Sequence, residues 1–230
     1  MARSSARLAA RTLLVLLVLP RGLARAEFGD VHRVCDGTAY TLEKGEFTVG
    51  VLGPLQIGVT DEVTVVTHPI LHLFLTPNLL IRGKVLDRGA ALALNLGYIQ
   101  TFLDPKKLDF PGTVAFFPTL TVPLSRSVAL SGQAGYQLNV SPVQHGLSFG
   151  GGVAILASRA DLVNLQVQGE YFRETGVQRP VVLLVYTHAF YRFRIRAGVA
   201  VGRFPIQVGS ASTRIKNLPA YPVVDVMWWL

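Results

Sequence analysis

The sequence predicts an all-β protein: a membrane-embedded antiparallel up-and-down β-barrel of about 12 strands, within a range of 10–12. Half of the 230 residues are hydrophobic and only 16% are charged, against roughly 25% in soluble domains. The longest apolar run, Leu13–Leu19, is far short of the roughly 20 residues that a membrane-spanning helix needs. Most of the chain instead alternates apolar and polar residues with a period of two, which is typical of strands with two unlike faces.

The first 26 residues have the three parts of a cleavable signal peptide. A basic region with three arginines comes first, followed by the apolar block Leu13–Leu19 and an A-x-A cleavage site at Ala24–Ala26. A mitochondrial transit peptide is the alternative, because the segment holds five arginines and no acid, but the apolar block would interrupt an amphipathic helix. We therefore expect export to the bacterial outer membrane. The expected division is 1–26 signal peptide, 27–45 periplasmic lead-in and 46–230 transmembrane β-barrel.

The charge of the chain lies mostly in this leader. Loss of its five arginines lowers the basic residues from 22 to 17 against 14 acids, and the net charge from +8 to +3. The remaining basic residues are scattered, so we expect no nucleic-acid partner. Cys35 is the only cysteine, which excludes an internal disulfide and a thiolate metal cluster. The residues before it lack the small side chains of a lipoprotein site, and we expect an unpaired cysteine in a flexible segment.

Twelve segments of the mature chain follow the period-two pattern. The clearest places Asn164, Gln166, Gln168 and Glu170 opposite four mostly apolar neighbours. The segments, in order, are 46–51, 55–60, 63–67, 79–85, 92–98, 113–124, 128–138, 147–157, 162–172, 181–190, 193–201 and 224–230. Their connections alternate between short turns, such as Ser125–Ser127, and longer loops, among them Asn139–His145. Short turns at one rim and long loops at the other are typical of outer-membrane barrels.

The aromatic residues favour a membrane barrel over a β-sandwich, which is the alternative fold. They fall mostly near the expected strand ends, where the aromatic girdles of a barrel meet the membrane interfaces. Ordinary strand propensity would also enrich aromatics. The residues are Phe47, Tyr98, Phe116, Phe117, Tyr136, Tyr171, Phe172, Tyr186 and Phe190.

The last residues also resemble those of an outer-membrane protein. Val224, Val226, Trp228 and Leu230 alternate up to the end of the sequence, which resembles the C-terminal strand that such proteins present to the barrel-assembly machinery. That pattern usually ends on an aromatic residue, whereas this sequence ends on leucine. The resemblance implies two partners, the assembly machinery and outer-membrane lipid.

A second resemblance is local. The stretch Gly37–Phe47, continuing through Gly58–Asp61 and Thr67–Pro69, resembles the opening of a family of uncharacterised bacterial outer-membrane β-barrel proteins. It covers under a fifth of the chain. The family implies the fold and the compartment, and it names no functional site.

The sequence gives no signature of an enzyme. It has no Gly-x-Ser-x-Gly elbow, phosphate loop or zinc motif, and Gly150–Gly152 lies within a strand pattern, where a bend is expected. Ser141 with His145, in an expected loop, is the best nucleophile and base pair. Such a pair occurs often by chance, so we expect no catalytic residue, no cofactor and no metal.

Function is therefore expected on the inward face of the barrel, because lipid-facing positions must be apolar. An arginine against lipid at the midplane costs roughly 2–4 kcal/mol. The predicted lumen-lining residues are Arg82, Lys84, Asn95, Gln133, Gln166, Gln168, Glu170, Arg194, Arg196 and Asp225. They favour a narrow channel or transporter for small solutes with a weak anion bias. The alternative is a structural or surface-interaction barrel with a packed polar lumen, and a barrel hydrolase is the least favoured.

Overall fold

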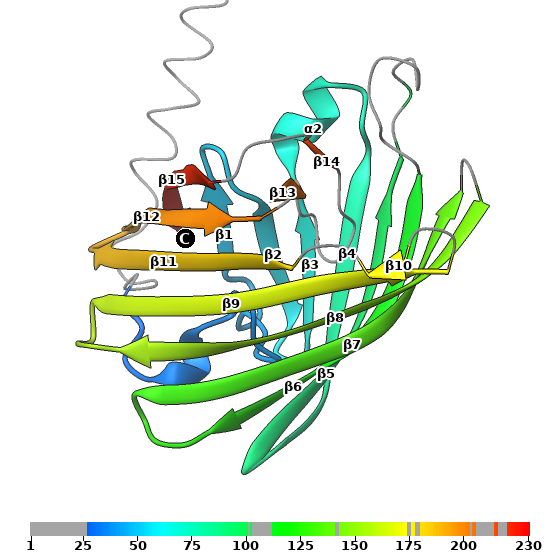
Figure 1. The fold of residues 1–230 in the computed structure, drawn as a ribbon. Helices are drawn as coiled ribbons and strands as arrows, with labels where there is room; N and C mark the ends of the chain where they lie inside the picture. The colour runs from blue at the N-terminus through cyan, green and yellow to red at the C-terminus, as the bar shows by residue number, and fades with distance from the viewer. Residues whose placement is uncertain are drawn as a thin grey trace, which may run out of the picture.

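The computed structural model is a closed antiparallel barrel of 12 strands (Figure 1). It describes residues 27–100, 102, 112–140, 143–173, 176–177, 180–202, 204–205, 214–215 and 220–230. The expected signal peptide, Ser141 and parts of the expected long loops lie outside these residues. Within the described residues, no helix is long and apolar enough to cross a membrane.

The twelve barrel strands agree closely with the predicted segments. They are β1 (Phe47–Gly50), β2 (Leu55–Thr60), β3 (Val63–Thr67), β4 (Asn78–Arg88), β5 (Ala90–Ile99), β6 (Thr113–Pro123), β7 (Val128–Val140), β8 (Val143–Leu156), β9 (Asp161–Phe172), β11 (Val181–Phe190), β12 (Phe193–Val201) and β15 (Ala220–Trp229). Each pairs with its neighbours along the chain, and the pairing of β15 with β1 closes the ring. The predicted loop Asn139–His145 is wrong, because β7 and β8 continue to pair as far as Val140 and Val143.

Five smaller elements complete the structure. Three short strands, β10 (Gly176–Val177), β13 (Phe204–Pro205) and β14 (Arg214–Ile215), lie in the connections after β9 and β12. The short helix α2 (Pro69–Leu73) joins β3 to β4, and the 3-10 helix η1 (Val31–Arg33) precedes the barrel. The five short connections after β2, β4, β6, β8 and β11 share one rim of the barrel, which we call the short-turn rim.

The two faces of the wall differ as the alternation predicts. Exposed apolar side chains cover the outside, and the aromatics among them include Tyr98, Phe116, Tyr136, Tyr171, Tyr186 and Phe190, each more than 40% exposed. Phe117 and Phe172, which we expect among the girdle aromatics, point inward and are 4% and 2% exposed. The inward face carries mostly polar side chains and alanines, as in β5, where Ala91, Ala93 and Asn95 are buried.

Residues 28–45 lie inside the barrel against the short-turn end of its wall, and we call this segment the plug. Its Phe28, Val31 and Val34 pack with Ala129, Leu156 and Trp229 of the wall in the largest buried apolar cluster of the described residues. Cys35, expected in a flexible segment, is buried and only 6% exposed. The predicted lead-in is therefore a packed part of the barrel interior.

Candidate functional site

The plug is fixed to the wall by hydrogen bonds from its backbone amides. The amides of Ala39 and Leu42 donate to the hydroxyls of Thr121 and Thr64, at 2.8 and 2.9 Å. The amides of Phe28 and Val31 donate to the carbonyl oxygens of Arg159 and Arg126, both at 2.9 Å. A buried amide without a partner costs roughly 1–3 kcal/mol, so these wall groups favour the plug inside the barrel.

Arg82 of β4 clamps the plug at two carbonyl groups. Its Nη1 donates to the carbonyl oxygens of Cys35 and Tyr40, at 2.6 and 3.1 Å. Its Nε donates to Oδ1 of Asn95 at 3.0 Å, and Asn95 in turn donates to the carbonyl of Phe117 on β6. The guanidinium is thus held by the wall on one side and holds the plug on the other.

Asp36 of the plug forms an ion pair with the wall. One carboxylate oxygen lies 3.1 Å from Nη1 of Arg196, and the other accepts from Nε2 of Gln56 at 3.1 Å. Asn164 donates to the Asp36 carbonyl at 3.1 Å. Burial would raise the pKa of Asp36, but Arg196, the Gln56 hydrogen bond and more distant arginines together lower it below its ordinary value. Asp36 is therefore a charged anchor at neutral pH.

The guanidinium of Arg194, on β12, packs against aromatic rings at the N-terminal end of the plug. The guanidinium carbon lies 4.0 Å from the ring centre of Phe28 and 3.5 Å from that of Trp229. Both distances are within the roughly 6 Å over which a cation is attracted to an aromatic face. Arg33 of the plug binds Glu46 at 2.5 Å, and Glu46 also accepts from the indole of Trp229 at 3.4 Å.

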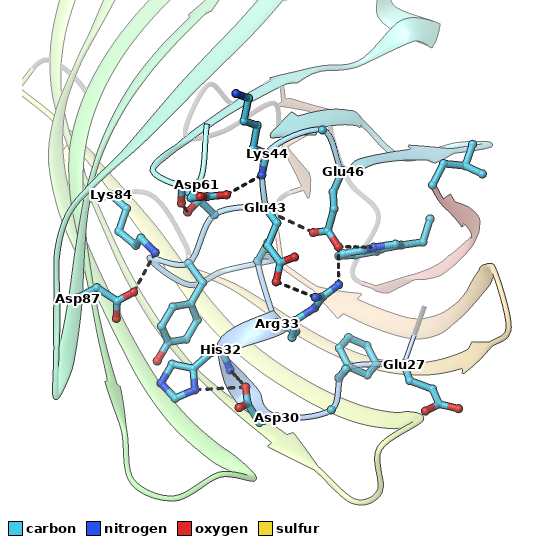
Figure 2. A pocket seen from close by; sticks show the side chains of 18 of the residues that line it. Glu27, Asp30, His32, Arg33, Glu43, Lys44, Glu46, Asp61, Lys84 and Asp87 are labelled. Atoms are coloured by element: carbon cyan, nitrogen blue, oxygen red, sulfur yellow. Dashed lines mark hydrogen bonds and ion pairs between the residues drawn. The ribbon is translucent and has the colours of Figure 1, made fainter. Parts of the chain in front are cut away.

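A cavity of about 860 Å³ opens at the short-turn rim, between the plug and the wall. Figure 2 shows the charged side chains that line it. Six carboxylates face four basic side chains, and two of the basic groups, Arg33 and Lys84, are already paired with Glu43 and Asp87 at 2.9 and 2.8 Å. The mouth of the barrel is therefore acidic.

The plug leaves only a small space beside the glutamines of the wall. A pocket of about 20 Å³ lies between Gly37 of the plug and Gln133, Gln166 and Gln168, enough for about one water molecule. A Cβ on Gly37 would lie 2.1 Å from Nε2 of Gln166. This close approach, and a φ of +73°, require glycine at this point of the plug.

The ten predicted lumen residues all lie on the inward side of the wall, but they do different things. Arg82, Arg194 and Arg196 contact the plug, and Asn95 positions Arg82. Lys84 lines the acidic mouth, and Glu170 shares the inward face of β9 with Gln166 and Gln168. Asp225 accepts from the amides of Leu52 and Val226, each at 2.9 Å, and so fixes the turn between β1 and β2.

The sequence reasoning missed the partners of these residues on the plug. Asp36, the ion-pair partner of Arg196, was not predicted, and neither was Glu46, which directly follows the plug and pairs with Arg33. The available signal was the run of apolar residues between Phe28 and Leu42, which has no period of two and therefore no place in a strand. Such residues need a buried surface, and the interior of the barrel provides it.

Of the candidate catalytic pair, only His145 is among the described residues. His145 lies on β8, where its imidazole contacts the hydroxyl of Tyr136 on the outer surface, and Ser141 lies outside the described residues. Among the described residues, no three His, Cys, Asp or Glu side chains are grouped to hold a metal ion. No protein-family model and no curated protein sequence matches the chain.

Proposed function

We propose that this protein is an outer-membrane barrel whose own N-terminal segment closes the lumen, so that it acts as a gated passage for small solutes. Support for the membrane comes from the outer face, on which large apolar side chains are exposed on every long strand. Monomeric soluble proteins rarely expose apolar patches of more than a few hundred Å². Lipid is the environment that such a face requires.

The assembly route belongs to the same proposal. β15, which carries the alternating C-terminal residues, pairs with both β12 and β1 and completes the ring. Val224 is 58% exposed on its outer side. This supports recognition of that strand by the barrel-assembly machinery before closure, and insertion after export by the leader.

One observation supports the gating proposal most directly: the three arginines that would line an open lumen all contact the plug. Arg82 binds plug carbonyls, Arg196 binds Asp36, and Arg194 stacks on Phe28. The weak anion bias predicted from these side chains therefore belongs to the state in which the plug has left. In the closed state, a solute meets the acidic mouth instead.

Single-channel recording in a planar bilayer tests the gate. We expect rare, brief openings of the wild-type protein and a higher open fraction in Asp36→Asn, because the substitution removes the ion pair to Arg196. Asp30→Asn is the matched control, since Asp30 lies in the same segment and its carboxylate pairs, within the described part of the chain, with exposed His32. Equal open fractions in Asp36→Asn and Asp30→Asn would contradict the gate.

The packing of the plug also favours a second function, a structural or surface-interaction barrel with a permanently filled lumen. Its buried apolar cluster and wall hydrogen bonds resemble those of a protein core. This alternative predicts silent bilayers for the wild-type protein and for Asp36→Asn alike, although both insert.

A further inference from the structure

Four successive short turns each place an arginine at the short-turn rim. Arg88 is the last residue of β4, Arg126 lies between β6 and β7, Arg159 between β8 and β9, and Arg192 between β11 and β12. In Figure 1 these turns lie together at one end of the barrel. The fifth short turn, between β2 and β3, carries the acidic pair Asp61 and Glu62 instead. The basic arc therefore spans the strands from β4 to β12.

Three side chains of this arc are exposed to solvent. Arg88, Arg126 and Arg159 are exposed, and no carboxylate of the described residues lies within 4.0 Å of their guanidinium groups. By contrast, the acids near these turns are already paired: Asp87 with Lys84 at 2.8 Å and Asp161 with His188 at 2.8 Å. Arg88, Arg126 and Arg159 are therefore cations without an ion pair among the described residues, and of these Arg159 also borders the acidic mouth.

The arc lies next to the apolar outer surface. Leu124 precedes Arg126 and is 61% exposed, and Phe190 and Tyr191 precede Arg192 and are 63% and 61% exposed. The guanidinium of Arg192 lies 5.6 Å from the Tyr191 ring centre. Aromatic and apolar side chains beside cations are typical of the membrane interface, where phosphate groups lie directly above the acyl chains.

We propose that this arginine arc binds the phosphate groups of anionic phospholipids in the leaflet at the short-turn rim. A guanidinium forms bidentate hydrogen bonds to phosphate oxygens, and neighbouring turns place several along one line of head groups. The acidic residues of the mouth lie inside the ring and repel the same head groups, so lipid binds around the lumen and leaves it open. The inference rests on the membrane location proposed above.

Electron paramagnetic resonance of spin-labelled lipids tests the arc in vesicles containing the full-length mature protein. We expect spin-labelled phosphatidylglycerol to associate roughly two- to threefold more strongly than spin-labelled phosphatidylcholine at low salt, and the preference to weaken in high salt. The triple variant Arg88→Gln, Arg126→Gln, Arg159→Gln should lose most of it. Lys44→Gln, which removes a cation from within the mouth, should keep the preference for phosphatidylglycerol. Arg126→Gln alone should weaken it.

The outcomes separate this inference from the proposed location. Failure of the wild-type protein to insert into any vesicle would overturn the membrane proposal itself. Insertion without a preference for phosphatidylglycerol, or a preference that the triple variant retains, would overturn the arginine arc alone. If the triple variant retains the preference, the anionic lipid binds another part of the barrel.

Discussion

Asp36→Asn should loosen the plug while the barrel remains closed, and Cys35 reports the change. The substitution keeps the shape of the side chain but leaves Arg196 without its counter-ion. The side chains of Asp36 and Arg196 are 33% and 16% exposed, so the pair is neither fully exposed nor fully buried. Loss of an exposed ion pair costs about 0–1 kcal/mol, whereas loss of one partner of a buried pair costs about 3–5 kcal/mol. We expect a cost of about 2 kcal/mol, or roughly a 30-fold higher population of the released plug.

Labelling of Cys35 by a maleimide measures that population. The thiol is buried, and burial raises its pKa to about 11, so the wild-type protein should react far more slowly than the same chain unfolded in urea. Asp36→Asn should react about 30-fold faster than wild type. Asp30→Asn, at an exposed pair, should match the wild type.

The reasoning would be refuted by equal labelling rates in wild type and Asp36→Asn. A gel shift between unheated and boiled samples must show that both barrels are folded. Fast labelling of the wild-type protein itself would mean that the plug does not occupy the lumen in solution.

Three further predictions concern the same interior. The pKa of Asp36 is held below its ordinary value of 3.8, so its contribution to holding the plug is present above pH 3.8 and is lost as the pH falls through the lower, folded-state pKa. Hydrogen exchange of residues 28–45 should therefore stay slow from pH 7 to about pH 4. A loss of protection centred at or above pH 5 would contradict this anchor. Thr121→Val removes the acceptor of the Ala39 amide and should cost roughly 1–3 kcal/mol, seen as faster Cys35 labelling, whereas an unchanged rate would show that the hydrogen bond is dispensable. Gly53→Ala places a Cβ 2.2 Å from Oδ2 of Asp225, whereas the Cβ of Gly83→Ala meets nothing within 4 Å. Only Gly53→Ala should lower the urea midpoint of unfolding, by the equivalent of roughly 1–3 kcal/mol. Equal midpoints for the two variants would mean that Asp225 moves aside freely.

The alternation of residues was enough to predict the wall, for a physical reason. A strand between lipid and lumen must alternate, so the pattern from 162 to 172 identified β9 nearly to the residue. The prediction failed at the loop Asn139–His145, where β7 and β8 continue to pair as far as Val140 and Val143. Phe117 and Phe172 were misplaced because composition near a strand end does not say which face a residue takes.

The contents of the lumen could not be predicted in the same way. Arg82, Arg194 and Arg196 contact the plug, but alternation does not say what an inward cation meets. Their partners lie at residues 28–45, up to 166 positions earlier for Arg194 and Phe28, and no periodic pattern links the two regions. The prediction of free, anion-attracting arginines came from treating the wall without the segment that fills it.

A disulfide between the plug and the wall tests most directly whether the plug closes the lumen. The 2.8 Å contact between the Ala39 amide and the Thr121 hydroxyl limits the Cα–Cα distance of these residues to about 6.7 Å, within the range for a disulfide. In Ala39→Cys, Thr121→Cys, with Cys35→Ser to remove the competing thiol, we predict no conductance in planar bilayers when the bond is oxidised. Reduction should restore channel openings in the same membrane. Equal conductance in the oxidised and reduced states would contradict a plug that closes the lumen.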